Sequence, residues 1–320
     1  MWKNVKQVLK PYLRRIVQHF VMPPVRCYVR YAKTAVGKKF LWDKAINCRF
    51  RGFEPAKHNF VAKTFFGSKI ASNSNDILGR YVYYFGVWEP NLTNWISQRL
   101  APGDVFVDVG ANIGYHTLLA SMLVGDTGKV VSIEAFPAIF SLLEEHLALN
   151  HVRNVRAVNC AAWDGDGLVT FYTGLDDLPV TTTAMPQWAA EWHLENELKV
   201  GARPLSSILQ ADEIKAARLI KIDVEGAEWH VLAGMEPLMS ACSNDLEIIL
   251  EVTPSISETE GKTSEDILDF FAAWKFHPYC IDNAVNAYFA SHASPPRRIS
   301  DIPQGQTDVI FSRIDAEFLS

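Results

Sequence analysis

The sequence is poor in cysteine and lacks long apolar runs. Its five cysteines are scattered over 320 residues without a Cys-x-x-Cys pair, which argues against a disulfide framework or a zinc site and favours a reducing compartment. No apolar stretch reaches the length of a membrane span, and Pro11, Arg14 and Arg15 interrupt the stretch that a secretory signal would need. We therefore expect a cytoplasmic protein, with peripheral contact to a membrane as an open alternative.

What the sequence does contain is enough apolar material for a large core. At 320 residues, of which 48% are hydrophobic, the chain can bury the interior of a full-sized domain. We predict a main domain over residues 76–320, preceded by a mostly helical extension over residues 1–75. In the main domain, predicted strands alternate with helices, which is typical of an α/β fold with a parallel sheet.

Positive charge is concentrated at the N-terminal end. Residues 1–51 hold 13 Lys or Arg residues and one acid, Asp43, so this part carries +12 and the remainder −17. Within residues 1–22, apolar side chains recur at helical spacing with Lys3, Lys6 and Lys10 between them, which predicts a basic amphipathic helix. This helix either meets an anionic membrane surface or an acidic partner, or docks its apolar face on the main domain. No aromatic-basic recognition motif accompanies the charge, so we do not expect nucleic-acid binding.

A glycine turn between two predicted strands organises the main domain. Residues 105–109 form a short apolar run suited to a central strand of a parallel sheet, and the turn from Gly110 to Gly114 follows it. A helix over about residues 113–124 then offers its positive N-terminal end to a polar ligand group. The next strand, residues 130–133, leads to Glu134, where an acidic residue is placed to bind ribose hydroxyls.

The charge beside this turn indicates the kind of ligand. The turn lacks the Gly-x-Gly-x-x-Gly pattern of dinucleotide folds, and Asp108 at the strand end would repel a pyrophosphate. A carboxylate at this place suits a ligand with an ammonium or sulfonium group, such as S-adenosylmethionine. The alternative is an α/β domain with an ordinary glycine turn that binds no nucleoside.

A second group of acids is predicted at the same edge of the sheet. Residues 219–222 form another buried strand, topped by Asp223 and followed by Glu225. Because ligands of open α/β sheets lie outside the carboxyl ends of the strands, these two acids should share one crevice with Asp108 and Glu134. Converging carboxylates are costly unless they bind cationic groups, hydroxyls or a metal. Glu225 has a second interpretation, as a cap of the helix that follows it.

Further elements complete the predicted main domain. We predict helices over residues 91–100, 138–150, 227–238 and 264–274, and strands over residues 155–159, 168–172, 247–252 and 308–312, with Asn91 and Ser264 as caps. Ala161 and Ala162 follow one of these strands, where small side chains either leave room for an adenine ring or simply pack tightly. Glu89 lies among aromatic residues and is either a ligand contact or a surface acid.

Residues 173–201 break the alternation of strands and helices. This polar insertion carries Trp188, Trp192 and His193, and insertions of this kind often form a lid over a site. Tryptophan faces stack well on sugar rings, so these residues are candidate substrate contacts. The alternatives are that the tryptophans anchor the loop and that His193 is an ordinary loop residue.

Four stretches of the main domain form a specific set, and Trp88-Glu89-Pro90 with Leu92 precede them. The four are Asp108-Val109-Gly110-Ala111-Asn112-Ile113-Gly114-Tyr115, the helix end Ala148-Leu149-Asn150, residues 205–209, and Ile220-Lys221-Ile222-Asp223-Val224-Glu225-Gly226-Ala227-Glu228. Together they resemble the FkbM family of S-adenosylmethionine-dependent methyltransferases, and the resemblance covers roughly residues 78–255. It implies a Rossmann-like class I methyltransferase fold, with a seven-stranded, mostly parallel sheet whose last strand is antiparallel. The cofactor contacts that it implies are Glu89, Asp108, Gly110, Ala111, Asn112, Gly114, Glu134, Ala135, Ala161, Ala162 and Asp223.

The resemblance also implies O-methylation of a sugar, glycoside or polyketide-type hydroxyl. Holding oxygen, carbon and sulfur in line is worth about 7–11 kcal/mol, and a base that removes the hydroxyl proton adds about 10²–10⁴-fold. Asp223 is the first candidate for this base, with Glu225 and His116 as alternatives. Asp223 and Glu225 have a further interpretation as ligands of a divalent cation. The alternative function is a non-catalytic binding or scaffold protein that keeps the methyltransferase fold.

Overall fold

The chain forms two compact units. The first unit comprises residues 1–90 and 284–293, and the second comprises residues 91–283 and 294–320. The computed structural model describes residues 22–31, 37–42, 59–73, 76–174, 182–191, 193–257, 261–290 and 292–319. The amphipathic helix predicted within residues 1–22 therefore lies outside the described residues, apart from Met22. Within those ranges, no helix has both the length and the apolar character needed to cross a membrane.

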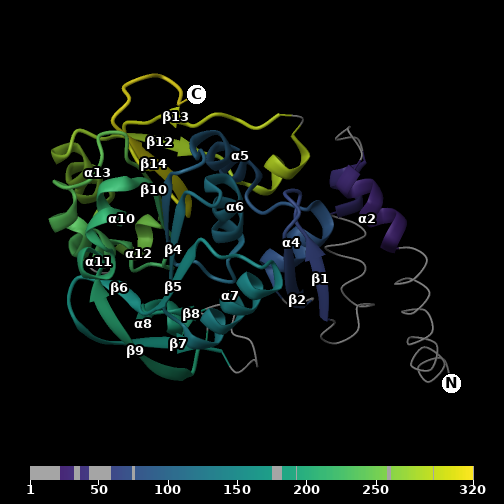
Figure 1. Ribbon diagram of the computed structural model, residues 1–320, viewed down its shortest axis with the longest axis horizontal. Coiled ribbons are helices and arrows are strands. Elements are labelled where there is room, and N and C mark those ends of the chain that lie inside the picture. The colour runs from purple at the N-terminus through teal and green to yellow at the C-terminus, as the bar shows by residue number, and fades with distance from the viewer. Residues whose placement is uncertain are drawn as a thin grey trace. The chain divides into compact units, whose positions relative to one another are not determined.

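A mixed sheet forms the centre of the second unit (Figure 1). Among the described residues it has eight strands in the order β13-β12-β14-β11-β10-β3-β4-β5. The strands are β3 (Val105–Val109), β4 (Lys129–Glu134), β5 (Val155–Asn159), β10 (Ala217–Ile222), β11 (Glu247–Val252), β12 (His277–Ile281), β13 (Arg297–Arg298) and β14 (Thr307–Ser312). The strands from β11 to β5 pair in parallel, whereas β14 is antiparallel to both β11 and β12. This confirms the predicted sheet, to which β13 adds a two-residue edge strand.

Helices cover both faces of this sheet, as the fold class requires (Figure 1). On one face lie α5 (Pro90–Arg99), α6 (Tyr115–Val124) and α7 (Pro137–Leu149), and on the other lie α10 (Ala211–Ala216), α11 (Glu228–Met235) and α13 (Ser264–Ala273). Two shorter helices of this unit are α9 (Leu205–Ile208) and α12 (Pro254–Ser257). The predicted helix over residues 227–238 changes to a 3-10 turn at Glu236–Leu238, because Pro237 cannot donate an α-helical hydrogen bond.

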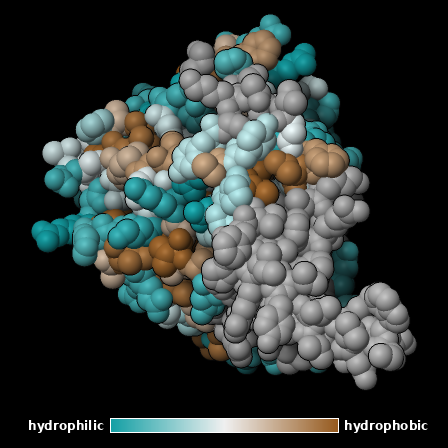
Figure 2. Space-filling model, turned by 90° about the vertical axis from the view of Figure 1, so that its right-hand side faces the viewer, coloured by the Kyte–Doolittle hydropathy of each residue, from teal (hydrophilic) through white to brown (hydrophobic). Residues whose placement is uncertain are grey.

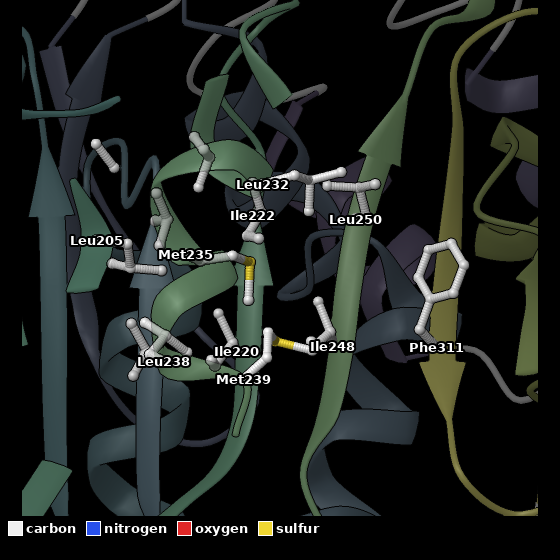
Figure 3. Close-up of a cluster of buried hydrophobic side chains, with 14 of the residues drawn as sticks. Leu205, Ile220, Ile222, Leu232, Met235, Leu238, Met239, Ile248, Leu250 and Phe311 are labelled. Atoms are coloured by element: carbon white, nitrogen blue, oxygen red, sulfur yellow. The ribbon is translucent and has the colours of Figure 1, made fainter. Parts of the chain in front are cut away.

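The largest hydrophobic cluster lies between the sheet and α11 (Figure 3). Its members from β10 and β11 alternate along each strand, so that every second side chain faces α11. The labelled members in Figure 3 are Leu205, Ile220, Ile222, Leu232, Met235, Leu238, Met239, Ile248, Leu250 and Phe311. Phe311 also stacks on Phe271 of α13, with ring centroids 3.6 Å apart. Close packing of these buried side chains holds the strands in place, and the site is built on the ends of those strands.

A second, smaller sheet includes parts of the predicted insertion. Its order is β6-β9-β7-β8, with β6 (Ala161–Trp163), β7 (Gly167–Thr173), β8 (Thr182–Thr183) and β9 (Asn196–Pro204). Between β8 and β9, Pro186–Glu191 forms helix α8. The insertion over residues 173–201 is therefore partly regular structure, and its role as a lid stays a prediction.

The first unit has an aromatic core. Its described elements are α2 (Met22–Tyr31), α3 (Lys38–Leu41), β1 (Asn59–Lys63), β2 (Lys69–Asn73), α4 (Ile77–Phe85) and η5 (Val285–Phe289). Trp42 packs against Tyr81, Tyr84 and Phe85, with ring centroids 4.8–6.0 Å apart. The antiparallel β1–β2 pair was not predicted for this extension. Three large hydrophobic side chains of this unit are exposed: Tyr31, Phe40 and Phe65. Figure 2 shows one face of the molecule, where hydrophobic areas are set among hydrophilic ones.

Two predicted helix caps are wrong. Helix α13 is capped by Thr263, whose hydroxyl accepts the Asp266 N–H in a reciprocal capping box, and not by Ser264. Helix α5 begins at Pro90, so Asn91 lies inside it. The Asn91 side chain instead donates to the backbone carbonyl of Asp282 and accepts the Ser294 N–H. Asn91 therefore ties α5 to the segments on either side of residues 284–293.

Candidate functional site

The glycine turn joins the ends of three adjacent strands. The N–H groups of Gly110 and Ala111 donate to the Ile133 carbonyl at 2.9 and 3.0 Å, which holds the turn against the end of β4. Gly110 has φ +78°, and a Cβ atom there would lie 1.7 Å from the Asp223 carbonyl oxygen. Only glycine therefore lets the turn after β3 approach the end of β10 this closely. Gly114 has φ +90° and is the N-cap residue of α6, a helix that the sequence predicted over about residues 113–124.

Glu134 supports the same turn from the end of β4. One carboxylate oxygen accepts the Asn112 N–H at 2.9 Å and the other accepts the Phe136 N–H at 2.9 Å. Burial raises the pKa of Glu134 to about 7, although both N–H groups act in the opposite direction. Each carboxylate oxygen retains a further lone pair, so Glu134 can still accept a ligand hydroxyl. Ala135 follows it, and its carbonyl accepts from the Asn159 side chain.

Asp108 and Lys221 lie side by side in the sheet. They are register partners on β3 and β10, and both are almost fully buried. The Thr117 hydroxyl donates to Asp108 at 2.6 Å. Burial raises the pKa of Asp108, and the positive charge of Lys221 opposes that rise. Sequence reasoning missed Lys221, although a lone lysine within the apolar run of β10 was the signal that could have identified it.

Lys221 also pairs with the first candidate base. Its Nζ atom lies 2.7 Å from Asp223 Oδ2. The Asp223 side chain is 26% exposed, whereas Lys221 is 3% exposed, so only the aspartate can be reached from solvent. The pair places an accessible carboxylate beside a buried positive charge.

The turn after β10 carries two glutamates with different surroundings. Glu225 is half-buried with φ +54°, and burial together with the charges of Asp223 and Glu228 raises its pKa to about 8. Glu228 is buried, and its Oε1 accepts the N–H groups of Val224 and Gly226 at 3.3 and 3.1 Å. Burial raises the pKa of Glu228 to about 7. Glu228 therefore supports the turn through these two hydrogen bonds, whereas the sequence suggested Glu225 as the alternative helix cap.

Two further acids reach the same edge from β11 and β14. Glu251 and Asp308 are register partners, and the charges of Asp223 and Asp308 add to burial in raising the pKa of Glu251. Burial raises the pKa of Glu251 well above its usual range and that of Asp308 to about 6. Asn283 donates to Asp308 at 2.6 Å. The sequence did not identify this group, because only the antiparallel register of β14 places Asp308 at the carboxyl edge.

His116 and the alanines are buried near these elements. His116, on α6, is 6% exposed, and burial with the nearby charge of Lys221 lowers its pKa well below the usual value. It is therefore neutral at physiological pH and a weak base. Ala161 and Ala162 are buried in β6, which pairs with β9, and their contact with an adenine ring stays a prediction.

The remaining predicted residues are Trp188, Trp192, His193 and Glu89, whose contact with a ligand stays a prediction. Trp188 is half-buried on α8 and His193 is exposed with φ +55°, whereas Trp192 is outside the described residues. Glu89 belongs to the first unit, where its N–H donates to the Tyr288 hydroxyl at 2.9 Å. The structure therefore brings together Asp108, Gly110, Asn112, Glu134, Asp223 and Glu225 from the predicted set.

The donor groups at this edge do not form a metal site. In the part of the chain that the structure describes, no group of three or more His, Cys, Asp or Glu side chains is arranged to hold a metal ion. The structure therefore gives no support to the divalent cation considered above.

Comparisons with known proteins show a family for this chain. A family model described as the methyltransferase FkbM domain matches residues 108–278. Methyltransferase 1 of Beauveria bassiana (strain ARSEF 2860) is 30% identical over 150 residues, which is 42% of this chain but only 60% of the relative. The 31-O-demethyl-FK506 methyltransferase FkbM of Streptomyces tacrolimicus is 30% identical over 197 residues, or 52% of this chain and 70% of the relative.

Solved structures of methyltransferases are also similar to this chain. The methyltransferase FkbM from Methylobacillus flagellatus KT has 15% identity and a TM-score of 0.39, covering 68% of this chain and 50% of its own. The TYW2 protein of M. jannaschii, solved with AdoMet, has 13% identity and a TM-score of 0.41, covering 82% and 89%.

Proposed function

Because this chain belongs to the FkbM methyltransferase family, we propose that it transfers a methyl group from S-adenosylmethionine to a hydroxyl of a sugar, glycoside or polyketide-type small molecule. The observation that carries the proposal is the convergence of acids on one lysine at the carboxyl edge of the sheet, beside the Gly110 turn. The relative from Streptomyces tacrolimicus is named for 31-O-demethyl-FK506, which supports an oxygen acceptor.

The residues at this edge fit the proposed cofactor. Burial raises the pKa of Glu134, and the charges of Asp108 and Asp223 add to this rise. Burial also raises the pKa of Asp108, where the charge of Lys221 lowers it and that of Asp223 raises it. A ligand that brings positive charge would relieve this repulsion, as an ammonium or sulfonium group does. Glu134 would hold the ribose hydroxyls through its remaining lone pairs, and Asp108 would face the amino-acid part of the cofactor.

When bound, S-adenosylmethionine supplies an electrophilic methyl group on a sulfonium sulfur. That methyl group would be transferred to the acceptor oxygen, and the acceptor hydroxyl would lose its proton. We assign this proton to Asp223, and the support is that its carboxylate is partly exposed while Lys221 pairs with it from the buried side. Such a base adds about 10²–10⁴-fold to the rate.

The other candidate bases fit this role less well. A carboxyl group with a pKa of about 8 is mostly protonated at pH 7, so Glu225 would donate a hydrogen bond to the acceptor rather than remove its proton. His116 is neutral and almost fully buried. We therefore assign the base to Asp223 and substrate orientation to Glu225, with Trp188 as a candidate stacking surface for a sugar ring.

The test is methyl transfer by the full-length protein to three probes: methyl glucoside, methyl rhamnoside and 31-O-demethyl-FK506. Asp223→Asn should lower transfer by at least about 10²-fold, while calorimetry should show that the variant still binds S-adenosylhomocysteine. The matched control is Asp245→Asn, an exposed aspartate ahead of β11 that contacts Arg218.

Three outcomes separate the possible functions. Transfer that survives Asp223→Asn would remove this residue as the base. Binding of S-adenosylhomocysteine without transfer to any probe would favour the non-catalytic alternative. A wild-type protein that binds neither S-adenosylmethionine nor S-adenosylhomocysteine would contradict both functions.

A further inference from the structure

The turn that carries Glu225 has an unfavourable backbone conformation. Glu225 has φ +54° and Gly226 has φ +102°. The left-handed region is unfavourable for a non-glycine residue, and it persists only where the surrounding structure holds it. Because the direction of the Glu225 side chain depends on this backbone, whatever holds the turn also positions the carboxyl group.

Hydrogen bonds hold the turn from two sides. From within α11, Glu228 accepts the N–H groups of Val224 and Gly226. From outside the main sheet, the Thr183 hydroxyl donates to the Glu225 carbonyl at 3.0 Å. The same hydroxyl accepts the Met185 N–H at 3.0 Å. Thr183 is fully buried, so water cannot replace the hydroxyl if it is removed.

Thr183 belongs to the insertion rather than to the main sheet. It ends β8, which pairs with β7 of the smaller sheet, and α8 with Trp188 begins three residues later. Through Met185 N–H the hydroxyl also fixes the start of the segment that leads into α8, where the Ala189 N–H bonds back to the Met185 carbonyl. One buried hydroxyl therefore joins the tryptophan-bearing insertion to the turn beside Asp223.

We propose that Thr183 is a positioning residue that sets the orientation of Glu225 and couples the insertion to the catalytic turn. The inference rests on the proposed function, because it gives Glu225 the role of orienting the acceptor. Without the hydroxyl, the Glu225 carbonyl and the Met185 N–H lose a buried partner. The turn can then relax from its left-handed conformation and move the Glu225 carboxyl group away from the acceptor.

The test compares Thr183→Val, which keeps the shape but removes the hydroxyl, with Thr183→Ser, which keeps the hydroxyl. Thr182→Val is the matched control, because adjacent strand residues point to opposite faces. Amide hydrogen exchange over residues 222–228 should accelerate by about 5- to 100-fold in Thr183→Val, as loss of a buried hydrogen bond predicts. It should stay at the wild-type rate in Thr183→Ser and Thr182→Val.

The activity readout uses whichever of the three probes is methylated. Thr183→Val should lower kcat and raise the KM for the acceptor, while S-adenosylhomocysteine affinity by calorimetry stays unchanged. In a Glu225→Gln background, Thr183→Val should have little further effect, since the two residues act through one contact. Should Thr183→Val fail to fold, Thr183→Cys, which has a weak S–H donor, takes its place.

Several results would overturn the inference. Three concern amide exchange over residues 222–228: a wild-type rate in Thr183→Val, an equal acceleration in Thr182→Val, or a fast rate in Thr183→Ser. The fourth is a double variant of Thr183→Val and Glu225→Gln whose loss of activity equals the product of the two single losses. The exchange measurement needs no acceptor, so it judges the Thr183 contact even if methyl transfer is never observed and the proposed function fails.

Discussion

Gly110→Ala should be among the most damaging single-methyl changes in the second unit. The added Cβ would lie 1.7 Å from the Asp223 carbonyl oxygen and 2.8 Å from the carbonyl carbon. Both are backbone atoms at the end of a buried strand, so neither can rotate away. The residue also has φ +78°. Overpacking costs about 1–3 kcal/mol and the left-handed backbone about 1–2 kcal/mol, which gives an expected loss of about 2–5 kcal/mol.

Three other glycines separate the two causes. Gly305→Ala tests strain alone, because Gly305 has φ +88° with nothing within 4 Å of a Cβ atom. Gly234→Ala tests collision alone, because its Cβ would lie 1.9 Å from the Trp163 carbonyl oxygen without a positive φ. Gly201→Ala has neither feature and should stay within about 0.5 kcal/mol of wild type.

The assays are thermal unfolding and calorimetric titration with S-adenosylhomocysteine. Gly110→Ala should lower the unfolding midpoint by about 4–10 °C, at roughly 2 °C per kcal/mol for a chain of this size. It should also weaken ligand binding, because the displaced Asp223 carbonyl belongs to the site. Equal midpoints and affinities for Gly110→Ala and Gly305→Ala would refute the claim that the turn and the β10 end are in obligatory contact.

Further predictions concern charge. Burial raises the pKa of Glu134 to about 7, so the affinity for S-adenosylhomocysteine should rise between pH 6 and pH 8 as the carboxylate forms. Glu134→Gln should bind this ligand weakly and independently of pH. If the affinity of Glu134→Gln changed with pH as that of the wild type does, the ribose assignment would be contradicted. Burial raises the pKa of Glu213, but hydrogen bonds from Arg156, Gln210 and Lys129 lower it to about 2 overall. A lowered pKa adds stability above pH 4.5 that is lost as pH falls toward 2. Glu213→Gln should therefore remove about 3 kcal/mol at pH 7, and chemical unfolding at pH 7 and pH 3 measures the difference. Deletion of residues 1–22 should reduce co-flotation with anionic vesicles at low salt, and equal flotation of both proteins would argue against surface binding.

The central strands of the second unit were predictable from the sequence alone. The strands β5 and β11 have the predicted bounds, and β3 does as well. These segments are short runs rich in β-branched residues with turn residues beside them, so local pattern and tertiary environment agree. The glycine turn was predictable for the same reason, since a left-handed turn beside a second backbone leaves few alternatives to glycine.

The smaller sheet was less predictable. Strand β9 is exposed along most of its length, so it lacks the apolar alternation that marks a half-buried strand. Its pairing with β7 is antiparallel but its pairing with β6 is parallel. Such an arrangement depends on contacts that no short window of sequence contains.

Some charged residues of the site were also predictable from local sequence, and others depend on how the strands pair. Glu134 and Asp223 follow apolar strands directly, and their position predicts that they face a common edge. Lys221 and Asp308 depend on register: Lys221 pairs with Asp108, and Asp308 pairs with Glu251. A shift of one residue would turn either side chain to the opposite face, so sequence spacing alone does not place them.

The first unit is built from two separate segments of the chain, which limits how this protein can be shortened. Its residues 284–293 lie between two segments of the second unit, and they supply Tyr288 and Phe289 to the aromatic core. A protein cut to begin at residue 91 would keep these rings but lose Trp42, Tyr81, Tyr84 and Phe85, against which they pack. The orphaned rings would favour self-association, so a well-behaved catalytic fragment should also replace residues 284–293 with a short polar linker.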